Sequence, residues 1–181
     1  WDAYLGAWLA VANWDTPTGH DLLWRAKSKT VLPYYIKIIS NPKLRLSETL
    51  RFFRAFDFQD IGDQHLLKLL AINHRDADEI ATYALKHLRK ITGSNAQVKS
   101  AVERLLKSKA GTSSYVTLVR RYRMIDKAPE LVALALRNTN NQLGYDAVHV
   151  LSGFKQLNLL DAAYNAAENK SPIISLIGNS R

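Results

Sequence analysis

The five histidines are the side chains of this chain best suited to acid–base chemistry or metal binding near neutral pH. A helical zinc site needs two histidines four residues apart, and no pair in the sequence has that spacing. His65 and His74 are nine residues apart, which does not place them on one helix face. We therefore expect structural positions, on the surface or at helix ends, for His20, His65, His74, His87 and His149.

Motifs for nucleophilic catalysis and for phosphate binding are also absent from the sequence. It contains no G-x-S-x-G, no G-x-G-x-x-G and no P-loop. The lack of cysteine removes disulfides, thiolate metal sites and C-x-x-C-H haem attachment. Asp76, Asp78 and Glu79 cluster at an expected helix start, where the helix dipole alone favours acids. We expect no catalytic site, metal or cofactor within this chain.

The positive charge is concentrated in residues 86–127. This stretch holds eleven Lys and Arg residues but only two acids, Glu103 and Asp126, while acids and bases are equal in number on either side of it. It therefore carries the whole net charge of +9. Such a field could steer an anionic partner. It could equally be a solvated face, or a face toward an acidic neighbouring domain. The basic candidates for an interaction surface are Lys86, Arg89, Lys90, Arg120, Arg121 and Arg123.

The segment 115–124 has the composition of a phosphate-binding surface. Its arginines alternate with Tyr115 and Tyr122, so that bidentate phosphate donors stand beside aromatic rings. Contacts of this kind would give salt-sensitive binding of nucleic acid. The alternative is that Tyr122 packs in the core while the arginines are solvated.

The four tryptophans all lie within the first 24 residues. Trp1 and Trp8 are seven residues apart and share a helix face. Exposed aromatic residues are typical of docking surfaces, so Trp1 and Trp8 are candidates for contact with a neighbouring domain. Packing against the next helical hairpin is the alternative.

Helical periodicity dominates the chain, and no stretch alternates with a period of two. No apolar run approaches the ~18 residues of a membrane span, and no signal peptide is visible. We expect a loop over 13–19 followed by a helix from His20, and Ser47 as the N-cap of a helix through Phe58. Asp76 to Glu79 resembles a capping box. Gly93-Ser94-Asn95 caps a further helix, whose expected buried face is Val98, Val102, Leu105 and Leu106. Gly111-Thr112-Ser113 precedes a helix expected over 115–124, and Pro129 lies near the first turn of one over 129–137. Two more helices are expected over 143–154 and 157–168, with a short last helix from 172.

An internal similarity suggests repeats. Residues 66–73 followed by 80–88 match 131–138 followed by 143–151, at an offset of 63–65 residues. Two such copies favour an all-α fold, a right-handed α-solenoid of antiparallel HEAT-like or armadillo-like hairpins. We expect a single helical-repeat domain over 1–181, a fragment of a larger multidomain protein. Within it, residues 1–58 form tryptophan-rich helices and residues 59–181 form repeat-like hairpins.

Three elements in order carry a family resemblance: Trp1–Trp8, then Leu23-Trp24-Arg25, then Arg54-Ala-Phe-Asp-Phe58. With residues 109–119 and 131–151, they resemble the PVC-type haem-binding proteins. These are bacterial membrane-bound dehydrogenases with several domains, one of which contains C-x-x-C-H. The resemblance implies an N-terminal β-propeller, a HEAT-like helical middle and a C-terminal cytochrome c domain. It places this chain in the middle region, with the c-type haem in a domain outside it.

The resemblance further implies export to the periplasm or cell surface. The expected function is that of a non-catalytic scaffold that links a propeller dehydrogenase-like domain to a cytochrome c domain. Its partners would be neighbouring domains of the same chain, with an acidic protein partner as a further possibility. The alternative is a basic HEAT-like solenoid that binds nucleic acid, as DNA-repair glycosylases of this architecture do. Nucleic acid is the less favoured partner, because no acidic catalytic residue accompanies the arginines.

Overall fold

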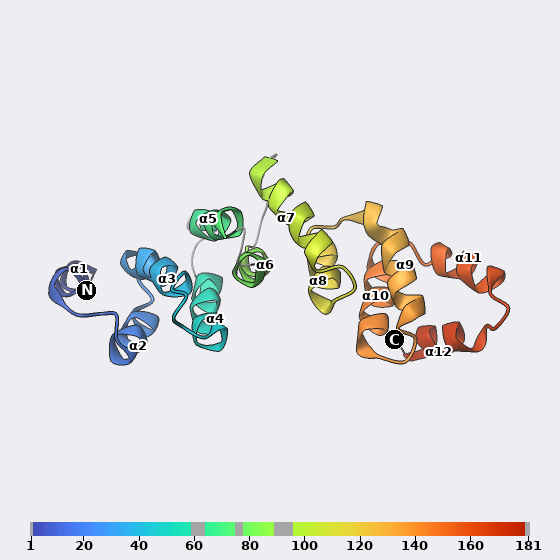
Figure 1. Ribbon diagram of the computed structural model, residues 1–181, viewed down its shortest axis with the longest axis horizontal. Coiled ribbons are helices and arrows are strands. Elements are labelled where there is room, and N and C mark those ends of the chain that lie inside the picture. The colour runs from blue at the N-terminus through green and yellow to red at the C-terminus, as the bar shows by residue number, and fades with distance from the viewer. Residues whose placement is uncertain (1, 59–63, 75–77, 89–95, 180–181) are drawn as a thin grey trace. The chain divides into compact units, whose positions relative to one another are not determined.

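The computed structural model describes residues 2–58, 64–74, 78–88 and 96–179. These residues form twelve α-helices and three short 3₁₀ helices, and no strand occurs among them (Figure 1). The all-α fold class predicted from periodicity is therefore confirmed. None of the described helices has the length and apolar character that a membrane crossing requires. The chain divides into two compact units, residues 1–102 and 103–181, and each is described separately.

The first unit contains α1 to α6 and the first half of α7. Its elements are α1 (Asp2–Val11), α2 (Pro17–Ala26), η1 (Lys29–Val31), α3 (Leu32–Ile39), α4 (Leu46–Ala55), η2 (Phe56–Phe58), α5 (His65–Asn73), α6 (Asp78–His87) and α7 (Ala96–Ser108). The second unit begins within α7 and continues through α8 (Ser113–Arg121), η4 (Ile125–Lys127), α9 (Ala128–Arg137), α10 (Gln142–Gly153), α11 (Asn158–Ala166) and α12 (Ser171–Asn179).

Aromatic rings fill the core of the first unit. Tyr35, Phe52 and Phe56 are fully buried, with ring centroids 5.4 Å apart for Tyr35 and Phe52 and 6.1 Å apart for Tyr35 and Phe56. The Tyr35 hydroxyl donates a hydrogen bond of 2.9 Å to the Leu23 carbonyl, so its polar atom is satisfied. Burial raises the pKa of Tyr35 to about 12, which keeps this donor neutral. The core thus ties α2, α3 and α4 together.

The core of the second unit is aliphatic. Its central helices are α9 and α10, which pack against each other, with α8 and α12 against α10 and α11 against α9. Small residues allow this close approach, since Ala135 and Ala147 are fully buried beside Leu131 and Leu151. Leu118 of α8 and Leu176 of α12 are also fully buried.

The two segments that match in sequence form equivalent packed helix pairs. α5 packs on α6 in the first unit, and α9 packs on α10 in the second. Their buried positions correspond closely. Residues 67, 70 and 71 of α5 correspond to residues 131, 134 and 135 of α9. Residues 81, 84 and 85 of α6, with residue 88 directly after it, correspond to residues 144, 147, 148 and 151 of α10. The pairwise similarity therefore reflects a shared packing register, while the solenoid itself stays a prediction.

Three predicted helix starts are wrong, and all three errors concern capping. The helix predicted over 115–124 is α8, which begins at Ser113 because the Thr112 side chain caps it, and ends at Arg121. α2 begins at Pro17 rather than His20, because the Thr16 hydroxyl accepts a hydrogen bond from the Gly19 amide at 3.1 Å and proline suits the first turn. α4 begins at Leu46 with Arg45, not Ser47, at the N-cap. There the Glu48 carboxylate accepts a hydrogen bond of 3.1 Å from the Arg45 backbone amide. The predicted capping box at Asp76 lies outside the described residues.

Candidate functional site

The basic candidates fall into separate parts of the fold. Lys86 lies in the last turn of α6 in the first unit. Arg120 and Arg121 lie in the last turn of α8 in the second unit, and Arg123 follows the C-cap residue Tyr122. Arg89 and Lys90, like Trp1, lie outside the described residues. Neither unit by itself brings all the basic candidates onto one surface.

Helix ends account for the positions of the four described basic candidates. A helix C-terminus carries partial negative charge, and a cation there gains roughly 0.3–1 kcal/mol. Arg123 also occupies a left-handed position, with φ of 48°. The Met124 amide donates to the Val119 carbonyl at 3.1 Å and the Arg123 amide to the Arg120 carbonyl at 3.2 Å. These are the two hydrogen bonds of a Schellman motif, so Arg123 closes α8.

The tyrosines that alternate with the arginines do not present open rings. Tyr115 is buried and Tyr122 is partly buried, so neither offers a full face for stacking on a base. Burial raises the pKa of Tyr122 above its ordinary range, while the neighbouring Arg121, which hydrogen-bonds to it, acts in the opposite direction. The arrangement agrees with the core-packing alternative for Tyr122.

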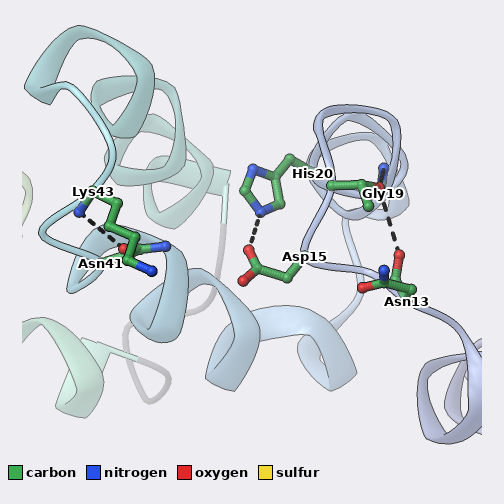
Figure 2. Close-up of polar contacts among 7 residues, drawn as sticks. Asn13, Asp15, Gly19, His20, Asn41 and Lys43 are labelled. Atoms are coloured by element: carbon green, nitrogen blue, oxygen red, sulfur yellow. Dashed lines mark hydrogen bonds and ion pairs between the residues drawn. The ribbon is translucent and has the colours of Figure 1, made fainter.

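Three of the five histidines form separate hydrogen-bonded pairs. His20 Nε2 lies 2.9 Å from the Asp15 carboxylate (Figure 2), and His87 Nδ1 lies 2.9 Å from the Asp57 carboxylate. Each contact ties a helix to a distant or preceding segment. Among the described residues, no group of three His, Asp or Glu side chains could hold a metal ion.

His74 makes a third contact of this kind. Its Nε2 lies 2.9 Å from the Ser40 hydroxyl, and the two residues cap the C-terminal ends of α5 and α3. Burial lowers the pKa of His74. The neutral ring therefore joins two helix ends, and the geometry is that of a structural link.

An apolar groove lies between α1 and α2, in the tryptophan-rich part of the first unit. Its volume is about 620 Å³, within the usual range for binding clefts. Two of its walls are largely in solvent, since Tyr4 is 80% exposed and Leu22 is 51% exposed. Trp8, a candidate from the sequence, is partly buried in this groove. The lining residues are Tyr4, Leu5, Trp8, Leu22, Arg25 and Ala26.

A second groove, of about 440 Å³, belongs to the second unit and has a mixed charge. It contains Glu103 and Asp126, the two acids of the basic stretch, together with Glu130. Lys127 Nζ lies 3.4 Å from Glu130 and 3.7 Å from Asp126. Burial, and then the charges of Glu130 and Asp126, raise the pKa of Tyr115 to about 12. Lys107 and Arg137 also line this groove, so its carboxylates face an equal number of cations.

The groove between α1 and α2 is therefore the clearest candidate interaction site. Sequence reasoning identified Trp8 but missed Tyr4, Leu22 and Arg25. The available signal was the sequence of α1, in which apolar residues occur on every side of the helix, a pattern typical of a helix covered all round. No protein-family model, curated protein or solved structure matches the chain.

Proposed function

We propose that this chain is a non-catalytic helical-repeat module that holds neighbouring protein domains together. The observation that carries the proposal is the apolar groove between α1 and α2, with Tyr4 and Leu22 standing in solvent. Clustered exposed apolar side chains are characteristic of docking surfaces, and tryptophan and tyrosine are the residues that most often dominate binding energy there.

The shared packing register of the α5–α6 and α9–α10 pairs supports a repeat architecture of HEAT-like hairpins. In such folds each pair contacts its neighbours, and the stacked pairs leave extended surfaces for partners. The resemblance to PVC-type haem-binding proteins supplies the partners: a propeller domain and a cytochrome c domain, exported to the periplasm or cell surface. The c-type haem then belongs to the cytochrome domain and not to this chain.

Nucleic-acid binding has no comparable observation in its favour. Tyr115 is buried and Tyr122 is partly buried, while Arg120, Arg121 and Arg123 lie at the C-terminal end of α8. The second groove carries as many acids as bases, so it does not form a cationic channel.

The test begins with the gene on either side of this segment. The proposal expects a propeller sequence upstream and a C-x-x-C-H motif downstream, and their joint absence would contradict the family assignment. The flanking domains, expressed separately, are then titrated into the chain by isothermal titration calorimetry. We expect saturable binding by one of them, weakened at least tenfold, or about 1.4 kcal/mol, when Tyr4 and Leu22 are both replaced by serine.

Leu69 provides the matched control. It is 48% exposed on α5, close to the exposure of Leu22, but does not line the groove. Leu69→Ser should leave binding unchanged. Equal losses from Leu22→Ser and Leu69→Ser would show that the groove is not the docking site.

A further inference from the structure

The groove between α1 and α2 also indicates the chemistry of its partner, an inference that rests on the proposed function. Five of its six described lining residues supply apolar surface or an aromatic ring, and Arg25 is the one charged residue among them. α1 packs against η1, while its other sides, including Tyr4 and Val11, remain in solvent. An apolar helix with so much exposed surface is stabilised when a partner covers it.

Among the described residues, the fold of the first unit leaves Arg25 without an ion-pair partner. Its natural partner would be Asp21, one turn earlier on α2 at the i, i+4 spacing that favours ion pairs. The Asp21 carboxylate is instead bound by Arg51 of α4. Within the described part of the chain, the exposed Arg25 guanidinium makes no hydrogen bond or ion pair. The groove therefore has a free cation with bidentate donor geometry at its edge.

We propose that this groove receives an amphipathic helix of a protein partner, with an acidic residue on the helix edge that pairs with Arg25. A helix presents apolar anchors at i, i+4 and i+7, which suits a trough between two helices. The partner's carboxylate provides the negative charge that Asp21, which is bound by Arg51, does not provide to Arg25.

An anionic lipid or fatty acid is a poorer fit to the same groove. An acyl chain is stabilised by walls that enclose it, whereas Tyr4 is 80% and Leu22 51% exposed. An open trough with partly wet walls is better filled by a helix, because a helix is broad enough to cover both sides.

The probe is a pair of labelled, end-capped peptides of about sixteen residues, long enough to present four leucines along one helix face. One carries glutamates beside the leucine stripe, and its twin carries lysines at the same positions. Fluorescence anisotropy at ~150 mM salt measures binding of each to the intact chain. We expect the acidic peptide to bind with a dissociation constant on the order of 10–100 μM and the basic twin to bind at least fivefold more weakly.

Reversal of one charge identifies the residue responsible. Arg25→Glu should remove the preference for the acidic peptide or invert it. Arg54→Glu is the matched control, since Arg54 is also exposed and also in the last turn of its helix, α4, but does not line the groove. Both variants change the net charge by the same amount. The control should therefore lower the affinity for the acidic peptide only slightly and keep the preference.

The possible outcomes separate the two proposals. Loss of all peptide binding on Tyr4→Ala confirms the groove, and no binding by either peptide contradicts both the groove and the module function placed there. Equal binding of the two peptides, or equal effects of Arg25→Glu and Arg54→Glu, overturns the acidic partner while the apolar docking site stands. Displacement of the acidic peptide by palmitate or by phosphatidylglycerol vesicles at concentrations far below those that unlabelled peptide requires would assign the groove to a lipid instead.

Discussion

Replacing Gly144 by alanine tests how tightly the α9–α10 turn is packed. Gly144 is the third residue of α10, and its amide donates to the Asn141 side chain at 3.3 Å. A Cβ atom at this position would lie 2.0 Å from the Asn138 carbonyl oxygen and 3.2 Å from Leu176. The Leu176 side chain can adjust, but the Asn138 carbonyl is backbone at the C-cap of α9. The turn itself must therefore move.

The cost follows from what that movement disturbs. Overpacking of a tight site costs about 1–3 kcal/mol. The Asn141 cap also weakens as the turn shifts, at up to about 1 kcal/mol. Alanine restricts the unfolded chain more than glycine does, which offsets about 0.4–1 kcal/mol. We expect a net loss of about 1–3 kcal/mol. For a chain of 181 residues each kcal/mol corresponds to roughly 2–4 °C, so Tm should fall by roughly 2–12 °C.

Gly153 provides a control within the same helix. A Cβ there meets nothing within 4 Å, so Gly153→Ala should be neutral or raise the unfolding free energy by up to about 1 kcal/mol. Gly19 has the same geometry in the first unit, where a Cβ atom would lie 2.3 Å from the Trp14 carbonyl oxygen. Gly19→Ala should therefore also lower the unfolding free energy. Thermal and urea unfolding followed by circular dichroism at 222 nm measure all three variants. A Gly144→Ala variant as stable as Gly153→Ala would refute the packing argument.

Three further predictions concern a histidine, a helix end and the arginines. Burial lowers the pKa of His74, so at mildly acidic pH the unfolded chain binds more protons than the folded chain. The unfolding free energy should therefore fall as the pH drops below about 6.5, and it should fall less steeply in His74→Gln. Lys155 closes α10 at φ of 58°, and Lys155→Gly should raise the unfolding free energy by about 1 kcal/mol in urea titrations. Duplex DNA should bind negligibly at ~150 mM salt; sub-micromolar binding lost on replacing Arg120, Arg121 and Arg123 by glutamine would contradict the interaction-module proposal.

Local signals predicted the helices of the second unit well. The Thr112 hydroxyl accepts from the Tyr115 amide at 3.4 Å and begins α8, while Pro129 lies in the first turn of α9. The buried face of α7, which includes Val98 and Leu105, also follows from its period. These features depend on neighbouring residues, so one sequence is enough to reveal them. The start of α4 was missed because Glu48 reaches back to Arg45, a pairing that competes with the serine cap and is not specified by residue type alone.

The site was harder to predict, because it depends on contacts between distant segments. Trp8 and Leu22 belong to different helices, and their shared groove exists only once α1 has packed on η1. Whether Arg25 is free depends on Arg51, which is distant in sequence and takes the carboxylate of Asp21. No periodicity in α2 contains that information.

Part of the positive charge of the chain lies at the ends of its helices, both inside and outside residues 86–127. Seven of the described helices carry a basic side chain in their last turn: α2, α3, α4, α6, α7, α8 and α9. The described non-glycine residues with positive φ are also all basic, Lys27, Arg123 and Lys155. A left-handed residue costs roughly 1–2 kcal/mol, and the attraction of a cation to the helix dipole offsets part of that cost. Helix termination by lysine and arginine therefore accounts for part of the net charge without a ligand. Arg25 is itself one of these last-turn residues, but it also lines the apolar groove and has no ion-pair partner among the described residues, which makes it the cation that a partner can use.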